Sequence, residues 1–124
     1  MGTEIERKFL VRGDAWLAAV TAQRRIVQGY IAHTDRATVR VRVAGDHATL
    51  TLKGNSHGIS RSEFEYPVPV DDGLRMLEEL ASGLVIDKVR HLVPVGAHTW
   101  EVDVFAGDNA GLVMAEVELG DADE

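Results

Sequence analysis

The sequence of 124 residues contains no cysteine. This absence excludes disulfides, thiolate metal sites and a cysteine nucleophile, and it fits the cytoplasm, where we expect the protein to be. No apolar run approaches the roughly 18 residues of a membrane span, and the chain shows no basic and apolar leader. We therefore expect neither membrane insertion nor a signal peptide.

Basic residues are also in deficit, since 13 Lys and Arg face 20 Asp and Glu, giving a net charge of −7. A protein that coats nucleic acid needs a basic surface, so we expect no nucleic-acid partner. The hydrophobic fraction of 45% and the charged fraction of 27% are ordinary for a globular protein. With no internal repeat, low-complexity segment or linker, residues 1–124 are predicted to form a single domain.

What the sequence has in abundance is alternation of charged and apolar residues. In the first predicted strand, residues 3–9, one face carries Glu4, Glu6 and Lys8, while Ile5 and Phe9 lie on the other. Further strands are predicted at residues 24–32, 38–43, 48–53, 61–66, 85–93, 100–105 and 112–119. Short helices are predicted at residues 15–23, capped by Asp14, and from residues 71–72 to near Gly83.

Two predicted turns fix which residues face each other. A two-residue turn at Gly45-Asp46 would pair Arg42 with Thr49 and Arg40 with Thr51, with all polar side chains on one face. A turn at Gly96-Ala97 would set Arg90 opposite Asp103, a favourable cross-strand charge pair.

These charged faces have two interpretations. They could be the solvated exterior of half-buried strands, with the valines and leucines inside. Alternatively they line a central tunnel, and the apolar faces point outward under helices. Four acidic i, i+2 pairs at about 2.4 kcal/mol each would then cost roughly 10 kcal/mol, comparable with the stability of a domain. A charged tunnel therefore requires the interleaved bases, and divalent cations would offset more of the repulsion.

The residue types of the charged faces suggest a chemistry. Carboxylates without cysteine or clustered histidine favour a hard metal, Mg²⁺ or Mn²⁺, and arginines with lysines favour a multiply charged phosphate. Together they suit phosphoryl transfer. The bases are Lys8, Arg40, Arg42, Lys53, Arg61, Lys88 and Arg90, and the acids are Glu4, Glu6, Glu63, Glu65, Glu101, Asp103, Glu116 and Glu118.

The motifs, in order, resemble those of the CYTH family, the triphosphate tunnel metalloenzymes, and in particular its compact bacterial inorganic triphosphatase-like form. Residues 4–8 match the family's N-terminal Glu-x-Glu-x-Lys signature. The resemblance continues over essentially the whole chain, through residues 28–30, 39–42, 51–54, 61–66, 88–90, 100–105 and 115–119.

This resemblance implies a mainly β (α+β) fold, an eight-stranded antiparallel closed barrel forming a charged tunnel, with a few short helices outside. It implies hydrolysis of tripolyphosphate to pyrophosphate and phosphate. The phosphate oxygens would be held by Lys8, Arg40, Arg42, Lys53, Arg61, Lys88 and Arg90. Glu4, Glu6, Glu63, Glu65, Glu116 and Glu118 would hold the metal or order the basic groups, and Asp103 would either join this metal set or orient Arg90. Among all these, we expect the catalytic residues to be Glu4, Glu6, Lys8, Arg40, Arg42 and Lys88, together with Tyr30.

Single residues carry weaker expectations. Tyr30 could reach the tunnel and assist water or substrate, or it could pack at a barrel edge. The five histidines have no ligand spacing, so surface or packing roles are expected for them. Trp16 and Trp100 are expected in the core. The loop at residues 54–58 is not a P-loop, because it lacks a Gly-Lys-Ser/Thr ending.

Family members usually continue into a helical segment that covers the barrel, whereas this chain ends at Glu124. Two short helices are too few to cover the outward apolar faces, so we expect a further C-terminal segment, with homodimer contacts as the alternative or additional cover. Other functions remain open: a nucleoside or thiamine triphosphatase, an adenylate cyclase, a non-catalytic polyphosphate-binding module, or, if the faces are assigned backwards, a lipocalin-like carrier.

Overall fold

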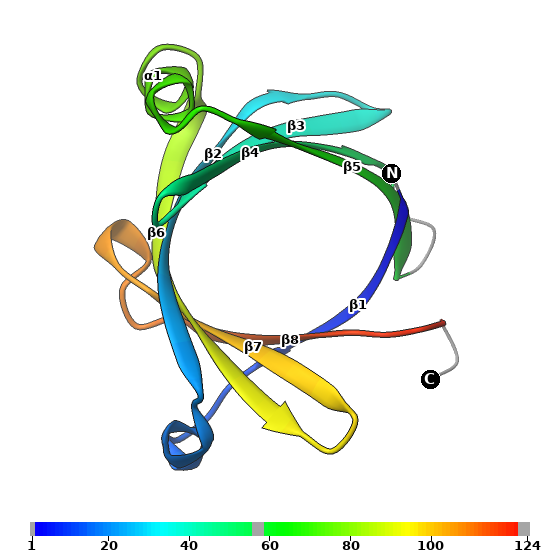
Figure 1. Ribbon diagram of the computed structural model, residues 1–124, viewed down its shortest axis with the longest axis vertical. Helices are drawn as coiled ribbons and strands as arrows, with labels where there is room; N and C mark the ends of the chain where they lie inside the picture. Colours follow the sequence, from blue (N-terminus) through cyan, green and yellow to red (C-terminus); the bar gives the residue numbers. More distant parts are fainter. Residues whose placement is uncertain (1, 56–58, 122–124) are drawn as a thin grey trace.

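The computed structural model describes residues 2–55 and 59–121, and these form a closed antiparallel barrel (Figure 1). Going around the barrel, the strands follow the order β1, β5, β4, β3, β2, β6, β7, β8. The strands are β1 (Gly2–Leu10), β2 (Ala22–His33), β3 (Ala37–Ala44), β4 (His47–Gly54), β5 (Ser60–Val68), β6 (Ser82–Val95), β7 (His98–Phe105) and β8 (Val113–Glu118). This confirms the predicted fold class.

Both predicted hairpin registers are confirmed. In the β3–β4 pair, Arg42 lies opposite Thr49 and Arg40 opposite Thr51. In the β6–β7 pair, Arg90 lies opposite Asp103. The period-two pattern determines these registers, because a slip by one residue would move every arginine to the apolar face.

The predicted helix at residues 15–23 is wrong in length and type. The chain forms only a 3₁₀ turn, η1 (Ala15–Ala19), and Asp14 makes no side-chain capping bond. Strand β2 then begins at Ala22, and the Thr21 amide donates to the Leu92 carbonyl at 2.9 Å. Residues 22–23, which helical spacing assigned to a helix, therefore belong to a strand, because they pair with the long β6.

The second helix, α1 (Val70–Glu79), exists but ends earlier than predicted. Residues from Ser82 onward belong to β6, so Leu84 lies in a strand. Gly83 adopts a φ of 76°, which glycine tolerates, at the start of this strand. Residues 107–109, predicted as loop, form a second 3₁₀ turn, η2 (Gly107–Asn109). No helix in the described part of the chain is long and apolar enough to cross a membrane.

The apolar faces of the strands point outward, and the helical elements lie outside the ring (Figure 1). Helix α1 places Leu77 on Val41, Val43 and Ala48, forming one buried cluster. A second buried cluster, made by β6, β7 and β8, packs against the segment around η1, and its members are Val93, Val102 and Ala115, flanked by Trp16 and Trp100. The helical elements cover only part of the exterior, and Leu10 and Leu84 remain 74% and 63% exposed. The further C-terminal segment stays a prediction.

Candidate functional site: a charged tunnel

The interior of the barrel is a cavity of about 410 Å³ to which all eight strands contribute side chains. Its lining contains every side chain that the sequence analysis predicted for the site. The complete lining is Glu4, Glu6, Lys8, Gln28, Tyr30, Arg40, Arg42, Lys53, Arg61, Glu63, Glu65, Ile86, Lys88, Arg90, Glu101, Asp103, Phe105, Met114, Glu116 and Glu118. The charged faces therefore look inward, and the solvated-exterior and lipocalin-like interpretations are wrong.

One group of charges surrounds Glu4. Its carboxylate accepts from Lys53 Nζ at 3.0 and 3.1 Å and from Arg61 Nε at 3.1 Å. Burial alone would raise the pKa of Glu4, but Lys53 and Arg61 lower it to about 2. Glu63 lies 3.4 Å from Lys53, and burial together with the Glu4 carboxylate raises the pKa of Glu63. Glu4 is thus a fixed anion that holds two bases in place.

A second group surrounds Asp103, whose side chain is 1% exposed. Lys88 Nζ lies 2.7 Å from Asp103 Oδ2, and Arg90 donates two bonds of 2.9 Å to the same carboxylate. Burial would raise the pKa of Asp103, but Arg90 and Lys88 hold it below its usual range. Of the two predicted roles for Asp103, this geometry matches the orientation of Arg90.

Arg40 and Arg42 differ from the other tunnel bases because they contact neutral acceptors. Arg42 Nε donates to Gln28 Oε1 at 2.7 Å, and Arg40 contacts Thr51 Oγ1 at 3.5 Å while its buried Nε has no partner. Within residues 2–55 and 59–121, neither guanidinium forms an ion pair, whereas Lys8, Lys53, Arg61, Lys88 and Arg90 each do. Burial, with repulsion from Arg40 and Arg90, lowers the pKa of Arg42 to about 10. Among the described residues, the tunnel therefore holds two adjacent cations that no carboxylate contacts directly, although Asp103 and Glu116 attract Arg42 from farther away. This is a suitable place for an anion.

Carboxyl groups also gather where they repel each other. Burial and the neighbouring Glu116 carboxyl raise the pKa of Glu6 to about 7, although Lys8 lies 3.4 Å from Glu6. No cluster of three or more acidic or histidine side chains with metal-holding geometry occurs among the described residues. The donor chemistry nevertheless fits Mg²⁺ or Mn²⁺, because crowded carboxyl oxygens are hard donors and a divalent cation would relieve the repulsion at Glu6.

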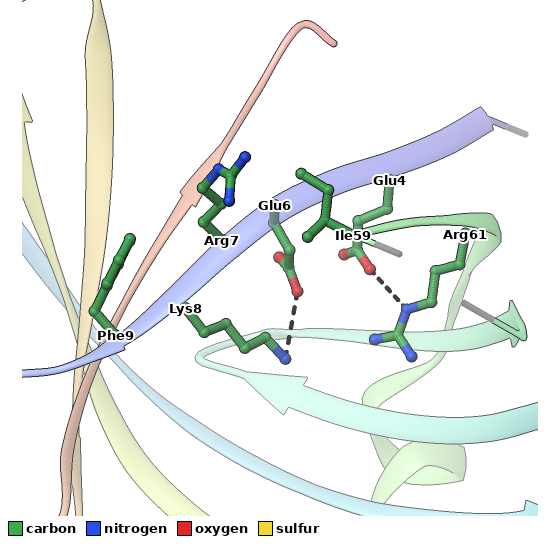
Figure 2. A pocket seen from close by; sticks show the side chains of 7 residues that line it. All are labelled: Glu4, Glu6, Arg7, Lys8, Phe9, Ile59 and Arg61. Carbon is green, nitrogen blue, oxygen red and sulfur yellow. Dashed lines mark hydrogen bonds and ion pairs between the residues drawn. The ribbon is translucent and has the colours of Figure 1, made fainter. Parts of the chain in front are cut away.

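A second cavity lies next to β1 (Figure 2). Strand β1 pairs with β5 through residues 2–5 but with β8 through residues 6–10, so the second half of β1 has no ladder to β5. A cavity of about 380 Å³ lies there, lined by Glu4, Glu6, Arg7, Lys8, Phe9, Ile59 and Arg61. This cavity is lined by β1 side chains that point into the barrel and by β1 side chains that point out of it. The Glu4–Arg61 and Glu6–Lys8 pairs border this cavity (Figure 2).

Several features of the site add to the predictions. Tyr30 is among the residues that line the tunnel. Gln28 and Thr51 hold the two arginines, and Phe105 places its ring 5.3 Å from Lys88 Nζ, yet none of the three was predicted as a site residue. The sequence does place Gln28 on the same strand face as Tyr30, since the two residues are two positions apart. The poor alternation of that strand left it undecided whether this face points into the barrel. None of the described histidines lines the tunnel, and His57 lies outside the described residues.

Comparison with known proteins gives a consistent result. The family model of the CYTH domain matches residues 2–124. An inorganic triphosphatase of Acetivibrio thermocellus is 50% identical over 123 residues, which are 98% of this chain and 77% of that protein. An inorganic triphosphatase of Nitrosomonas europaea is 38% identical over 122 residues, which are 94% of this chain and 76% of that protein. The crystal structure of the inorganic triphosphatase NE1496 aligns with a TM-score of 0.62 and 31% identity, covering 97% of this chain and 78% of that one.

Proposed function

Since the chain belongs to the CYTH domain family, we propose that it hydrolyses inorganic triphosphate to pyrophosphate and phosphate inside its barrel. The observation that carries this proposal is the pair of arginines, Arg40 and Arg42, which line the tunnel and form no ion pair with any carboxylate that the structure describes. A relative that is 50% identical over nearly the whole chain is an inorganic triphosphatase, and a triphosphate is a compact anion that would match this concentration of positive charge.

Binding would begin at these two guanidinium groups, which can donate several hydrogen bonds to phosphate oxygens. The proposal assigns further phosphate contacts to Lys8, Lys53, Arg61, Lys88 and Arg90. Asp103 and Glu4 hold four of these five bases in place before the substrate arrives. Such preorganised charge stabilises the transition state without a reorganisation cost at the moment of reaction.

In the proposed reaction, a water oxygen forms a bond to a terminal phosphorus and loses a proton to the solvent. The bond from that phosphorus to its bridging oxygen breaks, and pyrophosphate leaves with the bonding electrons. Carboxyl groups of Glu4, Glu6, Glu63, Glu65, Glu116 and Glu118 would hold Mg²⁺ or Mn²⁺, which neutralises phosphate oxygens and makes a water molecule more acidic. Asp103 would orient Lys88 and Arg90, because its carboxylate already contacts both. Tyr30, on the tunnel wall, would orient water or substrate.

The experiment is a substrate panel on the full-length protein, with tripolyphosphate, ATP and thiamine triphosphate, each with Mg²⁺, Mn²⁺ or EDTA. We expect metal-dependent phosphate release that is fastest with tripolyphosphate and is lost in Glu6→Ala. Faster turnover of ATP or thiamine triphosphate would favour a nucleotide or thiamine enzyme. Tight binding without any phosphate release would favour a polyphosphate-binding module.

Two further proposals concern the cellular location of the protein and the cover of its outer apolar face. The absence of cysteine supports a cytoplasmic location. The exposed Phe9, Leu10 and Leu84 support additional cover of the outer face, by a further segment or by a second copy in a homodimer. Sedimentation of the full-length protein distinguishes monomer from dimer.

A further inference from the structure

Gln28 is the immediate neighbour of Arg42 on the tunnel wall. The two residues are cross-strand partners in the β2–β3 pair, and the Gln28 side chain is 5% exposed. Its amide oxygen accepts from Arg42 Nε at 2.7 Å, a short bond for a neutral acceptor. Because Gln28 is buried and bound in this way, it restricts the rotamer of the guanidinium.

The acceptor distinguishes Arg42 from Arg90, an arginine of β6, which lies two strands from β3 around the barrel. Arg90 is also held by its neighbour across the strands, but that neighbour is Asp103, and Glu101 and Glu116 lie 3.3 and 3.6 Å away. These carboxylates offset the charge of Arg90. An amide oxygen can also accept a hydrogen bond from a guanidinium, yet it adds no negative charge.

The adjacent arginine, Arg40, also contacts an uncharged acceptor. Arg40 is 6% exposed, and the only side-chain acceptor it contacts among the described residues is the Thr51 hydroxyl, which in turn donates to Glu65 Oε2 at 3.2 Å. The Thr51 hydroxyl therefore bridges the Arg40 guanidinium and the Glu65 carboxylate. Both arginines of β3 are therefore held by uncharged groups.

We propose that Gln28 is a positioning residue that fixes the Arg42 guanidinium through a neutral acceptor, so that the full charge of Arg42 remains available to the triphosphate. This inference rests on the proposed function of the tunnel. It assigns a role to a side chain that neither binds metal nor needs to touch the reacting atoms.

The test compares two variants of similar side-chain shape. Gln28→Glu keeps an oxygen at the position of Oε1 but introduces a carboxylate that pairs with Arg42. Gln28→Met keeps the volume but removes the acceptor. The matched control is Gln23→Glu, which makes the same substitution at an exposed position whose cross-strand partner is His91, on the outward face of β6.

Four quantities are measured for each full-length variant: KM and kcat for tripolyphosphate with Mg²⁺, the Kd for tripolyphosphate in EDTA by calorimetry, and the urea midpoint of unfolding. We expect Gln28→Glu to raise KM and Kd about tenfold or more, the range of a hydrogen bond to a charged group, with an unchanged or higher urea midpoint. Gln28→Met should raise both constants less and lower the urea midpoint, and Gln23→Glu should match the wild type.

A merely structural role for Gln28 predicts the opposite order, with Gln28→Met the more damaging variant and Gln28→Glu tolerated. Wild-type KM and Kd in Gln28→Glu would overturn the inference while leaving the proposed function intact. Wild-type protein that binds tripolyphosphate without hydrolysing it would overturn the proposed function, and the Kd values would still decide the role of Gln28. Wild-type protein that neither binds nor hydrolyses tripolyphosphate would overturn both.

Discussion

Asp103 accepts hydrogen bonds from Lys88 at 2.7 Å and from two nitrogens of Arg90 at 2.9 Å, and its side chain is almost completely buried. One carboxylate thus compensates two cations at the centre of the barrel. Neither cation has another carboxylate as close, since the other partners of Arg90 lie at 3.3 and 3.6 Å.

Replacing Asp103 with Asn should therefore destabilise the protein strongly. Removal of one partner from a buried ion pair typically costs about 3–5 kcal/mol, because the other charge remains buried without compensation. Urea unfolding of Asp103→Asn measures this loss. Thr99→Val, at an exposed position of the same strand, is the control. A variant as stable as the wild type would show that Lys88 and Arg90 do not depend on Asp103.

Replacing Arg42 with Met should reduce kcat/KM for tripolyphosphate by about 10²-fold or more, the effect of losing one preorganised charge at a transition state. The control is Arg25→Met, which removes an exposed guanidinium that pairs with Asp87 on the outer surface. We expect Arg25→Met to keep wild-type kinetics. Equal losses in both variants would indicate a general charge effect and not a contact in the tunnel.

The raised pKa of Glu6 predicts how stability depends on pH. The ordinary value is 4.5 and the folded value is about 7, so between these pH values the folded state holds a proton that the unfolded chain releases. The contribution of Glu6 to the free energy of unfolding therefore falls as pH rises from about 4.5 to about 7. Urea unfolding in EDTA at several pH values should show a smaller decline in Glu6→Gln than in wild type. Glu78→Gln, on the exposed side of α1, should keep the wild-type profile. An identical profile in Glu6→Gln would contradict the assignment.

Glu4 predicts the opposite trend at lower pH. Its folded pKa of about 2 lies below the ordinary 4.5, so its stabilising contribution is complete above about pH 4.5 and is lost as pH falls toward 2. In Glu4→Gln, the acid-induced decrease in the free energy of unfolding should be smaller than in wild type. An unchanged acid transition would show that Lys53 and Arg61 do not stabilise the Glu4 carboxylate in solution.

The packing of α1 gives a prediction that is independent of the tunnel. A Cβ at Gly73 would lie 2.9 Å from the Ala48 Cβ and 3.2 Å from Val43 Cγ2. Overpacking of this kind typically costs about 1–3 kcal/mol, although alanine gains up to about 1 kcal/mol in helix propensity over glycine. We expect Gly73→Ala to lower the urea midpoint without changing KM. Asp72→Ala, at the exposed neighbouring position, should leave the midpoint nearly unchanged.

The sequence predicts the barrel well where strands alternate strictly. Charged or hydroxylated residues occupy three successive alternate positions in each of β3, β4 and β7, and a change of register would move those groups to the apolar face. The prediction fails at residues 15–23 and around Leu84, because apolar spacing in a short segment fits a helix and a buried strand equally well. There the pairing of β2 with β6 decides the structure.

The charged side chains of the site were predictable, and so was the Arg90–Asp103 pair, but the other pairings were not. Alternation alone places Glu4, Arg42 and Asp103 on tunnel faces, since each lies in a strand of clear period. Which base meets which acid depends on the tilt and stagger of the strands around the closed barrel. That Asp103 binds two cations while Arg42 meets an amide therefore becomes visible only in three dimensions.

The most direct test of the charged tunnel as a triphosphate site is phosphorus NMR of the full-length protein incubated with tripolyphosphate and Mg²⁺. The account predicts equal amounts of pyrophosphate and phosphate, formation that stops on addition of EDTA, and loss of both products in Arg42→Met but not in Arg25→Met. Product formation at the wild-type rate by Arg42→Met would contradict it.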